Sequence, residues 1–134
     1  MNWKEVILIL IFWKNKMLYV EIANTPEKHE KGLMFRKYLS SRAGMLFKFK
    51  DPKVLNFWGL NTYIPLDIAF VDEDNKIIKI TKIAPMSLKT VSSDKPCVIA
   101  IEANDDYFKN NRIFVGNKIS MGKDDIDIDV VRFI

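Results

Sequence analysis

The fold of this chain is constrained most by a series of short apolar segments separated by turn signals. Residues 66–71 and 97–103 are almost continuously apolar, while residues 18–22 and 77–83 alternate apolar with polar side chains. Apolar runs of about four to eight residues predict buried strands, and alternation at a period of two predicts half-buried ones. The sequence Asp-Glu-Asp-Asn at residues 72–75 is a turn signal, so we expect a hairpin across it.

More segments of this kind extend the pattern, at residues 45–49, 54–58, 119 and 124–134. Asp51-Pro52 predicts a turn between the first two of them, and residues 85–96 predict a polar loop. Short strands at this spacing, with only two short helices, are typical of a mainly β fold. We therefore expect a compact β-sandwich or partly closed barrel of about seven or eight strands.

The two helices are predicted from capping signals. Thr25 is a good N-cap, Pro26 fits the first helical position, and Glu27 suits the positive end of the helix dipole. These residues predict a helix from Pro26 to about Met34, with Leu33 facing the core. A second helix of one to two turns is expected through residues 105–108, with Asn104 as its cap.

Length and composition fit one globular domain. The chain has 134 residues, 49% of them hydrophobic, which is enough to build a core and excludes a disordered chain. Its single cysteine, Cys97, excludes an intramolecular disulfide framework. Because Cys97 lies in an apolar segment, inert packing is expected for its thiol. We predict a single β domain over residues 17–134, preceded by an apolar leader or extra strand at residues 1–16.

That leader contains an unbroken apolar run from Val6 to Trp13. The run is far shorter than the ~20 residues that span a bilayer, and no small-x-small cleavage site follows it. Three interpretations stay open: a buried strand, a weak interfacial anchor through residues 3–13, or sequence ahead of a true start at Met17. Without a cleavage site the sequence favours the cytoplasm, with export or attachment to a membrane surface as alternatives.

The charge pattern does not favour nucleic-acid binding. The net charge is +4, and 17 of the 21 cationic side chains are lysines, which are typical of a solvated surface. Aromatic residues do alternate with lysines over Phe47, Lys48, Phe49 and Lys50. In a strand this alternation places the phenylalanines on the core face and the lysines in solvent. The ordinary interpretation is therefore a core strand and not a platform for nucleotide bases.

Blocks of sequence resemble a known family. They are TPEKHEKGLMFR at residues 25–36, GMLF at 44–47, FWGLNTYIPLDIAF at 57–70, IEAN at 101–104 and VGNKI at 115–119. In this order they resemble domain of unknown function 192 (DUF192), over about residues 18–121. The resemblance implies a compact β-sandwich or barrel of the kind found in bacteria and archaea, with no assigned activity. Where the family has FWMKNT, this chain has Gly59 and Leu60 in place of Met and Lys.

Candidate site residues are the polar side chains inside apolar blocks, because burying an unpaired polar group costs free energy. They are Arg36, Asn61, Thr62, Asp67 and Glu102. In a structural interpretation, Arg36 pairs with Asp67 or Glu102, while Asn61 and Thr62 bond to the backbone of the turn before Pro65. In a functional interpretation, these residues line a cleft floored by Trp58, in which Arg36 holds a ligand.

The function that we favour from sequence is a non-enzymatic module that binds a small polar or anionic ligand, or a peptide. Its predicted ligand-binding residues are Arg36, Trp58, Asn61, Thr62 and Asp67. One alternative is a hydrolase-type enzyme in which Asp67 and Glu102 act as acid and base. Another is a structural or interaction domain without a ligand. The sequence does not indicate an oligomeric state.

Metal and cofactor sites are not predicted. The single histidine, His29, lies on a helix rich in lysine and glutamate and is expected in solvent, without a second ligand for zinc. Asp125-x-Asp127-x-Asp129 resembles the start of a calcium loop, but Val130 stands where the loop needs glycine. We expect these aspartates on the solvent face of an edge strand, with Ile126, Ile128 and Val130 on the other face.

Overall fold

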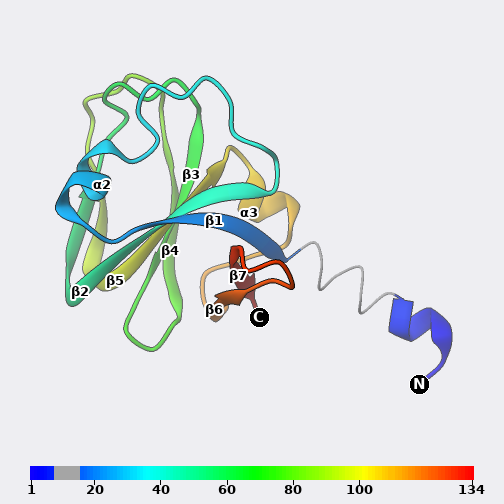
Figure 1. Cartoon of the computed structure of the whole chain (residues 1–134). Helices are drawn as coiled ribbons and strands as arrows, with labels where there is room; N and C mark the ends of the chain where they lie inside the picture. The colour runs from blue at the N-terminus through cyan, green and yellow to red at the C-terminus, as the bar shows by residue number, and fades with distance from the viewer. Residues whose placement is uncertain (8–15) are drawn as a thin grey trace.

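The computed structural model describes residues 1–7 and 16–134 and consists of one curled sheet that forms a half-barrel (Figure 1). The prediction of a mainly β, partly closed barrel is confirmed. The strands are β1 (Met17–Ala23), β2 (Ala43–Phe57), β3 (Leu66–Val71), β4 (Ile77–Ile83), β5 (Val91–Asn104), β6 (Ile119–Lys123) and β7 (Asp129–Phe133). The short helices are α2 (Pro26–Lys31), α3 (Tyr107–Asn110) and a helical segment at residues 3–7.

The strand order is β4-β3-β5-β2-β1-β7-β6. β1 and β2 are parallel, whereas the other strand pairs are antiparallel. Parallel neighbours need a long crossover connection, and residues 24–42, which include α2, supply it here. An isolated bridge between Lys76 and Lys118 links the regions just before β4 and β6, the two edge strands, so the sheet curls toward closure.

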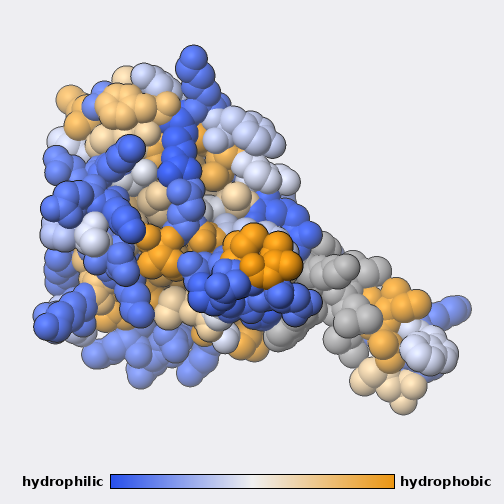
Figure 2. All heavy atoms as spheres, in the orientation of Figure 1, coloured by the Kyte–Doolittle hydropathy of each residue, from blue (hydrophilic) through white to orange (hydrophobic). Residues whose placement is uncertain are grey.

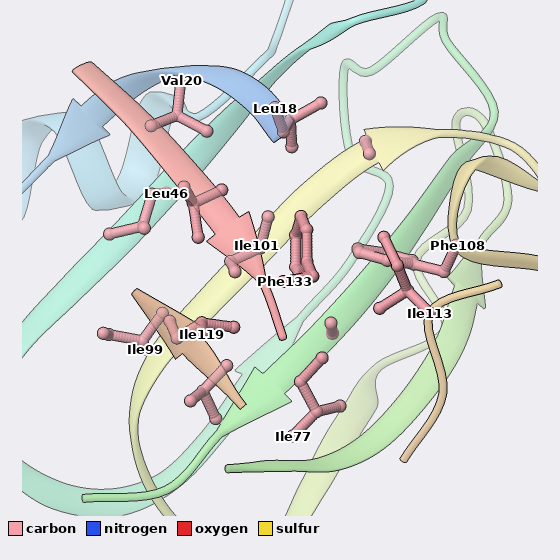
Figure 3. Packing of buried hydrophobic residues seen from close by; sticks show 14 of the residues in the cluster. Leu18, Val20, Leu46, Ile77, Ile99, Ile101, Phe108, Ile113, Ile119 and Phe133 are labelled. Carbon is pink, nitrogen blue, oxygen red and sulfur yellow. The ribbon is translucent and has the colours of Figure 1, made fainter. Parts of the chain in front are cut away.

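Each face of the sheet carries its own apolar cluster. The first core gathers side chains from most strands and from α3, among them Leu18, Leu46, Ile101, Phe108 and Phe133, which converge in Figure 3. The second core lies on the opposite face, beneath the crossover connection, and includes Leu33, Met45, Phe47, Ile68, Phe70, Cys97 and Ala100. Strand alternation therefore divides the buried residues between two packed faces.

The long strands differ from the prediction at two places. β2 continues through Asp51-Pro52, where a turn was expected, because a register shift between Lys48 and Lys53 takes up the irregularity. The predicted loop at residues 85–96 ends early, since β5 begins at Val91. Ser93 makes this polar segment compatible with a strand: its Oγ accepts the N–H of Leu55 at 2.9 Å and donates to the carbonyl of Lys95 at 2.7 Å.

The N-terminus of α2 agrees with its capping signals, but the helix is shorter than predicted. The Lys28 N–H donates to Thr25 Oγ1 at 3.2 Å, and Pro26 occupies the first turn. The helix ends at Lys31 and not near Met34, because Gly32 follows with a φ of 47°. Leu33 is buried, as predicted.

Asn104 does not cap the second helix. The cap is Asp106, with a left-handed φ of 65°, and α3 begins only at Tyr107. The Asn104 side chain instead donates to the carbonyls of Leu39 and Ser40, at 2.8 and 3.0 Å. It thereby ties the end of the crossover connection to the end of β5.

The C-terminal tail is not one continuous strand. Asp124 Oδ1 accepts the N–H groups of Ile126 and Ile128, at 3.0 and 2.9 Å, and so forms a turn ahead of β7. Ile126 is 74% exposed, so its predicted place on a buried face was wrong. Asp127 and Asp129 pair with Lys123 on the surface.

At the N-terminus, most of the apolar run from Val6 to Trp13 falls in residues 8–15, outside the described residues. The three interpretations of this run, and the division at residue 16, stay predictions. Within residues 1–7 and 16–134, no helix is both long and apolar enough to cross a membrane. Among these residues, Trp3 is exposed and β1 begins at Met17.

Candidate functional site

A pocket of about 370 Å³ lies between the crossover connection and the second-core face of the sheet. α2 and the residues after it form one wall, β2 another, and the loop after β2 part of the rim. The lining residues with polar or ionisable side chains are His29, Glu30, Lys31, Lys53, Asn56, Thr62 and Glu102, and the main apolar ones are Leu33, Met34, Phe47, Phe49, Phe57 and Trp58. The volume is within the range of small-molecule sites.

Glu102 forms the floor of this pocket. It lies near the end of β5, between Met45 of β2 and Ile68 of β3, both members of the second core. The residue is only 5% exposed, and none of the residues in the described part of the chain gives its carboxyl a hydrogen bond or an ion pair. Burial raises the pKa of Glu102 to about 8, since the charged form has lost its water without gaining a partner.

Gly44 allows the strands to approach each other beside this residue. A Cβ at position 44 would lie 2.3 Å from the carbonyl oxygen of Glu102 and 2.8 Å from a methyl group of Leu18. Any side chain there would push β2 away from β5. The backbone position of Glu102 therefore depends on a glycine in the neighbouring strand.

Aromatic rings build the wall of the pocket. The rings of Phe47 and Phe57 meet edge to face with centroids 5.0 Å apart. Phe49 is stacked on the His29 imidazole at 4.1 Å, and Lys53 Nζ lies 4.8 Å from the Phe49 centroid. The Phe49 ring therefore already has the His29 imidazole and the Lys53 ammonium as neighbours.

His29 was expected in solvent, and this prediction was wrong. Its Nε2 lies 2.9 Å from the carbonyl oxygen of Ala23 and 2.8 Å from that of Lys48, so the ring is half-buried between β1 and β2. The sequence feature that could have indicated partial burial of His29 is its position four residues before the buried Leu33. The imidazole fixes α2 onto the sheet and lines the pocket at the same time.

The rim consists of three loops at residues 32–42, 58–65 and 84–90, which hydrogen bonds join. The Phe35 N–H donates to the carbonyl of Asn61 at 2.8 Å, and the Met86 N–H donates to that of Thr62 at 3.0 Å. Phe35, Asn61 and Met86 have φ angles of 66°, 54° and 58°. Left-handed conformations of bulky residues such as Phe and Met are strained, and such strain clusters at binding sites.

The loops also expose apolar surface. Figure 2 shows orange side chains among the loops at the top of the view, beside blue, hydrophilic ones. Phe35, Tyr38, Trp58 and Met86 are exposed by 59%, 78%, 47% and 53%. The rim therefore combines hydrophilic side chains with aromatic ones, and the hydrogen-bonded loops keep these aromatic side chains exposed to solvent.

The departure from the family pattern at Gly59 has a structural reason. The Gly59 N–H donates to the carbonyl of Ser87 at 2.9 Å, and a Cβ at Gly59 would lie 2.0 Å from the carbonyl oxygen of Ala84. This backbone contact excludes a methionine at position 59 in the present loop conformation. The loops of the rim pack together here at a distance that only glycine allows.

Two of the predicted ligand-binding residues line the pocket, and a third supports its rim. Trp58 and Thr62 are both lining residues, and the Thr62 hydroxyl donates to the carbonyl of Leu60 at 3.1 Å. Asn61 contributes its backbone carbonyl to the contact with Phe35. Of the two side chains predicted to bond the backbone of this turn, that of Thr62 does so, whereas the contact of Asn61 is made by its backbone carbonyl.

Arg36 lies outside the pocket. Its guanidinium forms a two-pronged pair with the carboxylate of Glu21 on β1, with Nη2 2.8 Å from Oε1 and a second contact between Nη1 and Oε2. The predicted pairing of Arg36 with Asp67 or Glu102 was therefore wrong. The guanidinium holds the pKa of Glu21 below its ordinary value.

Asp67 lies on the opposite face of the sheet from Glu102. It is 3% exposed and accepts a hydrogen bond from Lys82 Nζ at 2.9 Å, and Lys82 also contacts Asp105 and Asp106 at 2.7 and 3.0 Å. Asp67 borders an apolar groove with Phe108 and other first-core residues. The structure does not bring Asp67 and Glu102 together, so it gives no support to a hydrolase in which they share a substrate.

Within the described residues, no group of three or more His, Cys, Asp or Glu side chains is arranged to hold a metal ion. Cys97 is buried in the second core, as predicted, and burial raises the pKa of its thiol. A thiol in this state is a poor nucleophile.

Comparison with known proteins assigns the chain to a family. The model of DUF192, described as "Uncharacterized ACR", matches residues 10–121. The chain belongs to the DUF192 family. The resemblance found in the sequence is thereby confirmed, and the function of this family is unknown.

Two solved structures resemble this DUF192 domain. One is a protein of Sinorhizobium meliloti 1021 proposed to be a transcription regulator, with 33% identity and a TM-score of 0.74 over 75% of this chain and 79% of that chain. The other is a protein of unknown function from Novosphingobium aromaticivorans DSM 12444, with 34% identity and a TM-score of 0.72 over 74% and 71% of the two chains. Comparison with curated proteins finds no match.

Proposed function

We propose that this domain is a binding module for a small polar ligand, which enters the pocket above Glu102. One observation carries the proposal: a carboxyl with no partner among residues 1–7 and 16–134 lies at the floor of a pocket of about 370 Å³. Buried polar side chains in native proteins almost always have a partner, and exceptions call for an explanation. A ligand with a hydrogen-bonding group supplies that partner.

The surroundings of Glu102 support this proposal. Phe57, Trp58 and Leu33 offer apolar surface to the body of a ligand, while Thr62 and Asn56 add polar groups. The lining is mixed, with seven polar or ionisable residues beside the apolar ones, so it offers both polar and apolar contacts to a ligand. The pocket volume favours a small molecule; a peptide would fit only through one side chain or one terminus.

The site proposed here differs from the sequence hypothesis in its residues. Trp58, Thr62 and Glu102 are its members, whereas Arg36 and Asp67 have their own protein partners elsewhere. Arg36 forms part of a neighbouring depression with Glu21 and Met45. We therefore place the ligand above β5 and not beside the guanidinium.

A thermal-shift screen of a metabolite library tests the proposal. A ligand that binds only the folded state at a hundredfold excess over its Kd stabilises it by about 2.7 kcal/mol. Hits should be weakened at least tenfold by Trp58→Ala but not by Tyr63→Ala. Both side chains are 47% exposed on the same loop, and only Trp58 lines the pocket.

The position at which a hit binds on the protein provides the second readout. In amide chemical-shift maps, a bound ligand should perturb Glu102, Thr62 and the Trp58 indole, and leave Asp67 on the other face unchanged. The absence of any hit, or hits that Trp58→Ala and Tyr63→Ala weaken equally, would contradict a binding role for this pocket.

A further inference from the structure

The chemistry of the pocket narrows the class of ligand, on the basis of the function proposed above. The ionisable side chains that face the pocket are His29, Glu30 and Lys31 from α2, Lys53 from β2, and Glu102 from β5. Lys31 and Lys53 are two cations against the single exposed carboxylate of Glu30. The mouth is thus positively charged in sum, and it attracts anions.

The floor of the pocket is a hydrogen-bond donor. Burial raises the pKa of the Glu102 carboxyl to about 8, since no described residue pairs with it, so Glu102 is mainly protonated at pH 7. A protonated carboxyl carries one O–H donor, and a hydrogen bond from O–H to a charged oxygen is roughly twice as strong as one between neutral groups. An anionic oxygen is therefore the complement of Glu102 in this state.

A cationic ligand fits less well, although buried carboxyls and aromatic rings are common in cation sites. Lys53 Nζ already lies over the Phe49 ring at 4.8 Å, and the His29 ring is stacked on Phe49 at 4.1 Å. A ligand ammonium at this wall would meet the ammonium of Lys53. The aromatic surface left to a ligand is that of Phe57 and the half-exposed Trp58.

We propose that the pocket takes a small organic carboxylate, which accepts the hydrogen bond of Glu102 and places its apolar part against Phe57 and Trp58. Lys31 and Lys53 attract the anion at the mouth. The proton on Glu102 is part of the binding site, so binding is linked to pH. Deprotonation of Glu102 would set two carboxylates against each other and expel the ligand.

The test uses three matched series of probes and titration calorimetry on the full chain. The carboxylates are benzoate, phenylacetate and hexanoate; the controls are the corresponding neutral amides and the amines of similar size. At least one carboxylate should bind more tightly than its amide and its amine. Its affinity should fall about tenfold between pH 7 and pH 9, because the protonated fraction of Glu102 falls by that factor.

Glu102→Gln separates the role of the proton from that of shape. The amide keeps a donor that does not titrate, so the variant should bind the carboxylate with an affinity that is the same at pH 7 and pH 9. Asp67→Asn, on the other face, should keep the wild-type pH profile. Lys53→Gln should weaken the carboxylate several-fold and leave the amide unchanged, and melting curves establish that each variant is folded.

The outcomes distinguish this inference from the binding function itself. Binding of an amide or amine without any carboxylate overturns the carboxylate proposal and leaves a binding module. The same holds if carboxylate affinity in the wild type does not depend on pH, or if Glu102→Gln keeps the wild-type profile. Failure of all probes overturns the carboxylate proposal, and the library screen then decides whether the pocket binds any other ligand.

Discussion

Asp67 and Glu102 are two buried acidic residues in neighbouring strands, and their surroundings are opposite. In the β3–β5 ladder Asp67 is paired with Ala103 and Glu102 with Ile68, so the two residues are one register position apart. Their side chains point to opposite faces, since direction alternates along a strand. Asp67 accepts a hydrogen bond from Lys82, while Glu102 lines a pocket and has no polar partner in the part of the chain that the structure describes.

The difference shows that neighbouring strands of one sheet can bury one acidic residue with a cationic partner and another without a partner among the described residues. Asp67 has its partner inside the protein, so its charge belongs to the folded structure. Glu102 has none within the described residues, and its burial costs free energy until something binds. Buried polar groups of the second kind are retained at functional sites at the expense of stability.

The largest expected effect is on the pH dependence of stability. The pKa of Glu102 is about 8 in the folded state and near 4.5 when unfolded, so its contribution is fully present below pH 4.5 and is lost as the pH rises through 8. On this basis the wild type should lose on the order of 3 kcal/mol more than Glu102→Met between pH 5 and pH 8. Urea unfolding of both proteins at several pH values measures this difference, and parallel curves would show that Glu102 does not titrate in this way.

Removal of the paired carboxyl should destabilise the protein. Asp67→Ala deletes a charge-assisted hydrogen bond from a buried site, and we expect the free energy of unfolding at pH 7 to fall by about 2 kcal/mol. Lys82 is exposed and keeps Asp105 and Asp106, which limits the loss. Denaturant titration gives the value, with Asp67→Asn as the milder control; a loss below about 0.5 kcal/mol would mean that the pair is not stabilising.

Removal of the unpaired carboxyl should have the opposite sign. Glu102→Met replaces a polar group, for which the described residues supply no partner, by an apolar one of similar length, and we expect a gain of about 1 kcal/mol at pH 7. The same variant should bind no carboxylate probe. A variant that is less stable than the wild type would indicate that Glu102 has a partner in solution.

The smallest effect is expected for the pair between Arg36 and Glu21. The two side chains are 36% and 55% exposed, and exposed pairs contribute about 0.2 to 1 kcal/mol. Arg36→Ala should therefore cost at most about 0.5 kcal/mol, and less at high salt, without changing the affinity of any pocket ligand. Unfolding at two salt concentrations measures the stability cost, and calorimetry measures the ligand affinity. A loss of ligand binding would show that Arg36 belongs to the binding site.

The sequence predicted the strands well, because their signals are local. Alternation identifies β1 and β4, and a continuous apolar run identifies β3, within one or two residues of their bounds, and Thr25 and Pro26 locate the start of α2. Polarity inside apolar segments also singled out Asp67 and Glu102. The face of the sheet on which each lies, and the identity of any partner, depend on strand pairing between residues far apart in the chain.

Partners of the other candidates were missed for the same reason. Arg36 meets Glu21 because the connection between two parallel strands folds back over β1, which no local pattern reports. The half-buried state of His29 depends on carbonyls of β1 and β2. β2 passes through Pro52 because pairing with β5 outweighs the local turn preference.

The crossover connection between β1 and β2 is both a topological necessity and one wall of the pocket. Residues 26–34 supply seven lining residues, and they belong to no strand. Substitutions among the lining residues of 26–34 would therefore change the shape of the pocket without shifting the register of any strand pair. The sheet fixes the position of Glu102. Changes in this connection can therefore alter the size of the pocket while the half-barrel stays the same.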